Sequence, residues 1–145
     1  MTRIVLDTNL VVSALLSPEG KPATILKMVL NGEIDLVLSP AILKEISLVL
    51  NYDRIVALFT KRSVTREKVR DALEKIARTA IIVPGEADIH PIDKDPSDNM
   101  FLSCALEGKA DFIISGDRHL TDLVSFEGIS IVNSDTFLRL IKKGS

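Results

Sequence analysis

Residues 3–9 read Arg-Ile-Val-Leu-Asp-Thr-Asn, and this short segment is the strongest indication of the fold class. The consecutive apolar residues Ile4 to Leu6 are typical of a strand buried on both faces, not of one that alternates between core and solvent. The run ends at Asp7, and a helix is predicted directly after it. The same arrangement returns at residues 112–117, where an apolar run ends at Asp117. Strands of this kind, separated by helices, predict a parallel sheet.

Outward from residues 3–9, strands and helices alternate along nearly the whole chain. Strands are predicted at 3–6, 35–38, 81–83, 111–115 and 129–132, and helices at 9–16, 22–31, 40–50, 54–60, 65–80, 98–107, 118–125 and 134–143. Ser39 and Thr65 are predicted N-caps, and the last helix is capped by Ser134 or Asp135. We therefore predict an α/β fold, a three-layer α/β/α sandwich with a mostly parallel central sheet of about five strands. A length of 145 residues fits a single domain over 1–145.

The amino-acid composition limits the kinds of protein and of binding site that this chain can form. Hydrophobic residues make up 46% of the chain and aromatic residues only 4%, so the core is predicted to be aliphatic and base recognition by aromatic platforms is disfavoured. The net charge of −2 does not by itself indicate a nucleic-acid-binding protein. Cys104 is the only cysteine, which excludes an intrachain disulfide and a thiolate metal site and predicts a small buried side chain. Without a signal-peptide pattern or a long apolar run, we expect a cytoplasmic protein with no membrane association.

Four carboxylates occupy positions where a fold would tend to bury them. Asp7 and Asp117 follow apolar strands, Glu45 borders the apolar stripe of its helix, and Asp98 opens an apolar helix. Each has an ordinary alternative, because an acid after a strand or in a first helical turn is often only a cap, and Glu45 could be a solvated side chain. However, parallel strands end at one edge of the sheet, and sites form there where the strand order switches. If the four acids meet at that edge, their repulsion calls for a divalent cation.

In this order the four motifs resemble those of the PIN domain family. The residues that carry this resemblance are Asp7-Thr8-Asn9, Glu45 in the helix that starts at Ser39-Pro40, Asp95-Pro96-Ser97-Asp98, and Ser115-Gly116-Asp117. The resemblance covers essentially the whole chain and is strongest to the branch of VapC-like toxins of toxin–antitoxin systems. It implies an endoribonuclease that cleaves single-stranded RNA with Mg²⁺ or Mn²⁺. Asp7, Glu45, Asp98 and Asp117 would be both catalytic residues and metal ligands.

Further residues are assigned supporting roles. Thr8 is expected to orient Asp7, Asn9 to hold water, Asp95 to add an acid, and Ser115 to hold a water or a phosphate oxygen. Arg118 and His119 are candidates for RNA phosphate contacts because they adjoin Asp117, and His119 is a candidate acid or base. Residues 61–78 carry seven basic and three acidic side chains, which suits phosphate binding or, alternatively, a solvated helix with i,i+4 ion pairs such as Arg70–Glu74. His90 is expected to be structural or exposed.

Oxygen ligands favour Mg²⁺ or Mn²⁺ over Zn²⁺, which agrees with the resemblance. The implied partners are single-stranded or structured RNA, an antitoxin protein and a second copy in a homodimer, with residues 22–31 and 41–50 as its interface. The alternative from another class is a non-catalytic or regulatory metal-binding α/β module, such as an inactive PIN scaffold. A receiver-like domain is disfavoured because the second strand ends in Ser39-Pro40, where a phosphoacceptor Asp would be needed. An Asp-x-Asp phosphatase is disfavoured because Asn9 replaces the second acid.

Overall fold

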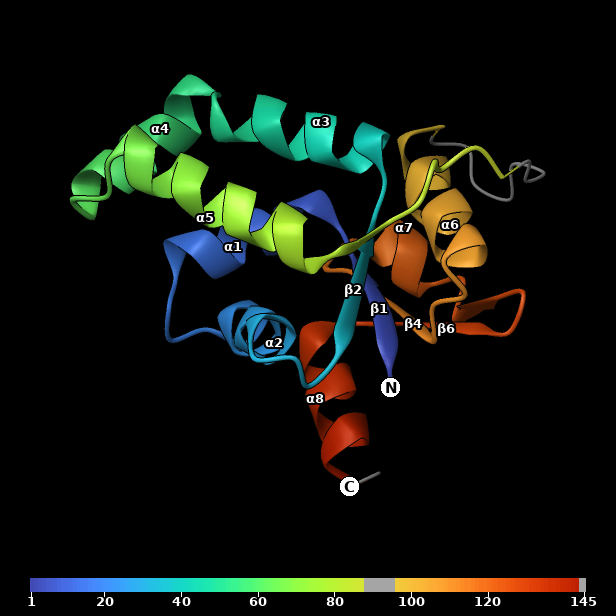
Figure 1. Cartoon of the computed structure of the whole chain (residues 1–145). Coiled ribbons are helices and arrows are strands. Elements are labelled where there is room, and N and C mark those ends of the chain that lie inside the picture. The colour runs from blue at the N-terminus through green and yellow to red at the C-terminus, as the bar shows by residue number, and fades with distance from the viewer. Residues whose placement is uncertain (88–95, 144–145) are drawn as a thin grey trace.

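The computed structural model describes residues 1–87 and 96–143, and within them a six-stranded sheet is packed between helices (Figure 1). The strands are β1 (Arg3–Leu6), β2 (Asp35–Leu38), β3 (Ile81–Ile82), β4 (Phe112–Ile114), β5 (Ser125–Phe126) and β6 (Ile129–Val132). The helices are α1 (Thr8–Leu16), α2 (Lys21–Leu30), α3 (Pro40–Leu50), α4 (Asp53–Lys61), α5 (Arg66–Thr79), α6 (Pro96–Glu107), α7 (Arg118–Thr121) and α8 (Ser134–Lys143).

The sheet has the strand order β3-β2-β1-β4-β6-β5, and every neighbouring pair is parallel except β5 with β6. The chain moves outward from β1 through β2 to β3 and then returns to the other side of β1 to form β4. The order therefore reverses between β1 and β4, which is where a doubly wound sheet opens a crevice at the carboxyl ends of its strands. Asp7 and Asp117 follow these two strands.

Helices cover both faces of the sheet, which confirms the predicted three-layer α/β/α arrangement. Helix α1 packs against α2 and α3, and α2 packs against α8, all on one face, whereas α6 lies across β1, β2 and β4 on the other (Figure 1). The central strands are apolar because both faces are covered: Ile4, Val5 and Leu6 are completely buried. Cys104 is also buried in this core, as predicted, and burial raises the pKa of its thiol to about 12.

The predicted element bounds differ from the structure mainly near the C-terminus. The sheet has six strands because residues 125–126 form a short antiparallel strand against β6. The helix predicted at 118–125 ends at Thr121, and Val124 has a positive φ of 65°, which no helix accommodates. Ser39 and Thr65 cap their helices as predicted, but α8 is capped by Asn133, whose Oδ1 accepts from the backbone N–H of Thr136 at 2.8 Å. No helix within residues 1–87 and 96–143 is long and apolar enough to cross a membrane.

Candidate functional site

Asp7 lies at the crevice between β1 and β4 and is only 5% exposed. Its Oδ1 accepts from the backbone N–H of Leu10 at 2.8 Å and so caps α1. Its Oδ2 accepts from the hydroxyl of Ser115 at 2.5 Å and from the backbone N–H of Gly116 at 3.2 Å, both beyond the end of β4. These three donors hold the carboxylate in one orientation across the point where the strand order reverses.

Burial raises the pKa of Asp7 above its ordinary value, because the charged form loses water. The hydrogen bonds from Ser115, Leu10 and Gly116 oppose this shift, and the nearby charge of Asp117 adds to it. No ion pair within the described residues involves Asp7, Glu45 or Asp117. Among the residues that the structure describes, Asp7 is thus a buried acid with hydrogen-bond donors but without a cationic side chain paired to it.

Glu45 reaches the same region from α3, where it is half-buried. The hydroxyl of Thr8, the residue after Asp7, donates a hydrogen bond to Glu45 Oε2 and links α1 to α3. We expected Thr8 to orient Asp7; its hydroxyl instead positions Glu45, and its role toward Asp7 stays a prediction. The sequence could not reveal the actual partner, because the two residues are 37 positions apart.

Asp117 follows β4 and caps the short helix α7. Its Oδ1 accepts from the backbone N–H of His119 at 2.9 Å, and its own N–H donates to Ser115 Oγ at 2.9 Å. Ser115 therefore bridges Asp7 and Asp117: its hydroxyl donates to the first and accepts from the second. We expected this hydroxyl to hold water or phosphate; in the structure it donates to one acid and accepts from the other, and one of its two lone pairs can still accept a hydrogen bond.

The three acids share one small pocket, which we call the acid pocket, with a volume of about 110 Å³. Its lining residues are Asp7, Thr8, Asn9, Glu45, Val49, Phe101, Asp117 and Leu120. Three of them are apolar, and each lies one helical turn beyond a predicted acid: Val49 after Glu45, Phe101 after Asp98, and Leu120 after Asp117. These three apolar residues were not predicted to belong to the site, although their i+3 or i+4 spacing from the acids is a signal visible in the sequence.

The remaining predicted site residues lie outside the acid pocket or partly or wholly outside the residues that the structure describes. Asp98 lies in the first turn of α6, but its side chain is outside the described part of the structure. Asn99, next to it, has a buried amide oxygen without a hydrogen-bond partner among the described residues. Asp95 and His90 lie outside the described residues. Arg118 and His119 are exposed on α7 and do not line the acid pocket.

The chemistry of the pocket fits a hard divalent cation. Its polar side chains offer only oxygen ligands, from carboxylates, one hydroxyl and one amide, and such ligands suit Mg²⁺ or Mn²⁺. A bound cation would also offset the negative charge of Asp7. Within residues 1–87 and 96–143, however, no group of three or more His, Cys, Asp and Glu side chains could hold a metal ion as placed. The residues fit by type, and a metal site is not assembled in the part of the chain that the structure describes.

Comparison with known proteins identifies the family. Residues 3–119, which include β1, α3, α6 and β4, match the PIN domain. The chain belongs to the PIN domain family. An uncharacterized protein of Methanocaldococcus jannaschii, MJ1680, is 31% identical over 121 residues, which are 83% of this chain and 74% of that protein.

PIN domains are generally nucleases, and PIN nucleases generally use divalent metals. Membership in the family therefore supports a hydrolase of nucleic acids and excludes neither RNA nor DNA as the substrate. The archaeal relative is itself uncharacterized, so its likeness adds nothing more specific. Membership in the PIN domain family confirms the family predicted from the sequence, whereas the VapC-like branch stays a prediction.

Proposed function

We propose that this PIN domain is a metal-dependent endoribonuclease that cleaves single-stranded RNA at the acid pocket. The observation that carries the proposal is Asp7, a buried carboxylate that is held by three donors, has no ion-pair partner in residues 1–87 and 96–143, and shares its pocket with Glu45 and Asp117. Burial without a countercharge is costly, and it is unusual except where a site uses the acid. The proposal takes residues 1–145 as one nuclease domain acting in the cytoplasm.

Two of the acids have hydrogen-bond partners that would hold them in position. Asp7 is fixed by Ser115 and Gly116, and Glu45 by the hydroxyl of Thr8. Such partners hold ligands in the orientation that a cation needs. Together with Asp98 and Asp117, these acids would hold Mg²⁺ or Mn²⁺, which when bound supplies positive charge near the phosphate and lowers the pKa of water.

The surroundings would bind and orient the RNA. Asn9 is exposed at the mouth of the pocket, where its amide can hydrogen-bond to water or to a phosphate oxygen. Val49, Phe101 and Leu120 form an apolar wall that limits the water in the pocket. Arg118 and His119, on the exposed helix α7 beside Asp117, would contact neighbouring phosphates.

The test is cleavage of a panel of labelled single-stranded RNAs by the wild type and by Asp7→Asn, with Mn²⁺, Mg²⁺ or EDTA. Loss of an outer-shell partner alone typically costs 10–100-fold, so removing a ligand should reduce cleavage at least about hundredfold. The exposed acid Asp53 lies outside the pocket, and Asp53→Asn should cut normally. Cutting that persists in EDTA or in Asp7→Asn would contradict the proposal. Metal binding without any cutting would favour the alternative, an inactive PIN scaffold that acts as a regulatory metal-binding module.

The finer biological role rests on the resemblance to VapC-like toxins and is proposed on that basis. As a toxin, the protein would arrest growth when expressed alone, would be neutralised by an antitoxin protein, and would form a homodimer. Induced expression of the wild type and of Asp7→Asn in the same host tests this role. Growth arrest by the wild type alone supports a toxin, whereas equal growth of both strains rejects it.

A further inference from the structure

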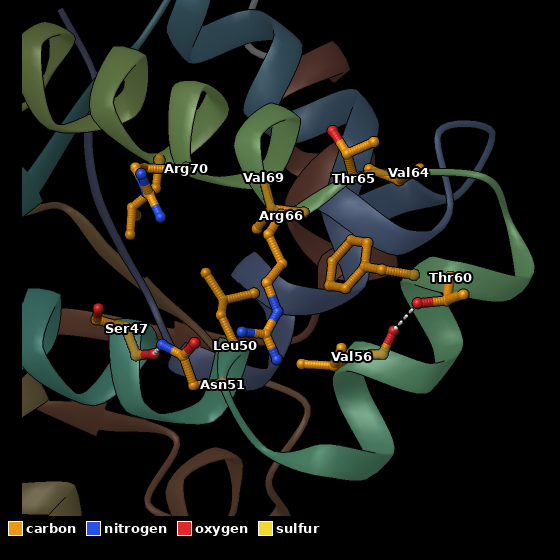
Figure 2. Close-up of a pocket in the computed structure, with 12 residues that line it drawn as sticks. Ser47, Leu50, Asn51, Val56, Thr60, Val64, Thr65, Arg66, Val69 and Arg70 are labelled. Atoms are coloured by element: carbon orange, nitrogen blue, oxygen red, sulfur yellow. Dashed lines mark hydrogen bonds between the residues drawn. The ribbon is translucent and has the colours of Figure 1, made fainter.

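A second and larger hollow lies between α3, α4 and α5, with a volume of about 250 Å³ (Figure 2). This volume is close to the lower end of the range for ligand pockets, about 300 Å³. Its floor is apolar, formed chiefly by Leu50, Phe59 and Val69. Two arginines of α5, Arg66 and Arg70, border it, and we call it the arginine groove. No part of it contributes to the acid pocket.

Arg66 and Arg70 have no anionic partner among the described residues. Neither takes part in a salt bridge or a side-chain hydrogen bond there, and the i,i+4 pair Arg70–Glu74 that the sequence suggested does not form. Figure 2 shows Arg66 extending from α5 into the space between Leu50 and Val56. Two unpaired guanidinium groups one helical turn apart over an apolar floor are suited to an anionic ligand with an apolar body.

Polar groups complete the lining of the groove. Asn51 donates its amide N–H to the backbone oxygen of Ser47 at 2.8 Å, which leaves the amide oxygen of Asn51 available to accept. Ser47, Thr60 and Thr65 also line the groove, although the hydroxyl of Thr60 already donates to the backbone oxygen of Val56 at 2.9 Å and that of Thr65 already accepts from the backbone N–H of Lys68 at 3.2 Å. A nucleobase presents both apolar faces and hydrogen-bonding edges, so a nucleotide matches this mixed lining.

Helix α3 connects the groove to the acid pocket. Glu45 and Val49 line the acid pocket, whereas Ser47, Leu50 and Asn51 of the same helix and its cap line the groove. Glu45 and Asn51 are separated by about 9 Å along the helix axis, at 1.5 Å per residue. The two hollows therefore lie along one helix, at a spacing that a nucleic-acid strand can bridge and a small anion cannot.

We propose that the arginine groove is a subsite for single-stranded RNA, which holds one base against its apolar floor while Arg66 and Arg70 bind the adjoining phosphates. The inference rests on the proposed RNA substrate and extends the RNA path beyond the acid pocket. It does not depend on cleavage, because binding can be measured without a metal ion.

The experiment measures binding of a fluorescent 12-nucleotide oligouridine in EDTA by anisotropy. The double variant Arg66→Gln/Arg70→Gln should bind roughly tenfold more weakly than the wild type, because charge-assisted hydrogen bonds are lost. The slope of log affinity against log salt concentration should fall by about 1.4, or about 0.7 for each phosphate contact to a single strand. The matched control is Lys75→Gln/Arg78→Gln, which removes the same charge from the same helix outside the groove and should keep the wild-type slope.

A second variant tests the groove itself without altering charge. Ser47 is exposed at the edge of the groove, so Ser47→Phe should fill the groove without disturbing the core and should weaken RNA binding by a similar factor. The proposal is overturned if Ser47→Phe binds RNA with wild-type affinity. It is also overturned if the Lys75→Gln/Arg78→Gln control loses as much affinity as the Arg66→Gln/Arg70→Gln variant, because Arg66 and Arg70 would then act only as general surface charge. No binding of RNA by the wild type would also overturn it. An acidic peptide that binds with the same arginine dependence, where RNA does not, would make a protein segment the occupant and reject the RNA subsite.

Failure of this inference can be told apart from failure of the nuclease proposal. If cleavage needs Asp7 but the groove variants bind and cut a long RNA like the wild type, the nuclease stands and the subsite is rejected. If binding depends on both arginines but no metal supports cutting, the subsite stands and the nuclease is rejected.

Discussion

Asp7 performs two structural tasks with its two carboxylate oxygens, one at the start of α1 and one across to β4. The capping interpretation and the site interpretation of this residue are therefore compatible. The same holds for Asp117, which caps α7 and also lines the acid pocket. Capping fixes the orientation of each acid, and this orientation presents the carboxylates to the crevice between β1 and β4.

The raised pKa of Asp7 predicts how stability depends on pH in the absence of metal. A carboxyl group whose pKa is higher in the folded state favours folding when it is protonated, below its ordinary value of 3.8, and loses this contribution as the pH rises through the folded value. The free energy of unfolding of the wild type should therefore fall relative to that of Asp7→Asn between acidic and neutral pH. Urea unfolding of both proteins across this range gives the difference. If the free energy of unfolding of the wild type instead rises relative to that of Asp7→Asn as the pH increases, the hydrogen bonds to Asp7 outweigh its burial.

Ser115 connects the two acids, so its hydroxyl should affect both stability and metal binding. Ser115→Ala leaves Asp7 without one donor and the N–H of Asp117 without its acceptor, at a cost of about 1–3 kcal/mol in the free energy of unfolding. Losing the hydrogen bond should also raise the pKa of Asp7 further, which weakens Mn²⁺ binding measured by calorimetry at neutral pH. Ser103→Ala is the control, because Ser103 is also buried but its hydroxyl donates to the backbone of Ala87, away from the pocket. Equal Mn²⁺ affinity in both variants would show that Ser115 only supports the fold.

At the scale of the elements, the continuous apolar runs predicted the central strands closely. The predicted strand bounds at 35–38 and 129–132 agree with β2, which is buried from Leu36 to Leu38, and with β6, which buries Ile129 and Ile131 on one face. Strand β5 was missed because it has only two residues, although it forms a tight hairpin with β6 through Glu127 and Gly128, which both have positive φ, and a Gly at such a turn was a local signal. The helix predicted after Asp117 was too long because the positive φ of Val124 depends on how the turn reaches that edge strand.

The candidate site shows the same limit. The strand ends carrying Asp7 and Asp117 could be predicted to meet, since parallel topology brings them to one edge of the sheet. The pairing of Thr8 with Glu45 could not, because it depends on how α1 and α3 pack against each other. The arginine groove could not be predicted from the sequence either. Residues 61–78 are visibly basic, but packing determines which side of α5 faces α3 and α4.

Gly108 sets the distance between α6 and the sheet. A Cβ atom at this position would lie 2.4 Å from a methyl carbon of Val37, a completely buried residue of β2. We therefore expect Gly108→Ala to lower the free energy of unfolding by about 1–3 kcal/mol, the usual cost of overpacking, as measured by urea denaturation. In the double variant Gly108→Ala/Val37→Ala, the new methyl group enters the space left by Val37, so the loss should be smaller than the sum of the single losses. Additive losses would show that the backbone of α6 moves instead.

At the scale of the whole molecule, the acid pocket sits where the strand order reverses, and its repelling charges oppose the packing of β1, α3 and β4 around it. A cation that binds only the folded state should therefore stabilise the entire domain. At a free Mn²⁺ concentration of about 100 times Kd, the gain is about 2.7 kcal/mol. For a chain of this length, this corresponds to a rise in Tm of roughly 8 °C in a thermal melt. Asp7→Asn should lose most of the shift, whereas Asp53→Asn should keep it, because Asp53 lies on α4 outside the pocket. Salt screening acts on all three proteins alike, so an equal shift in each, or no shift in the wild type, would contradict a metal site built on Asp7.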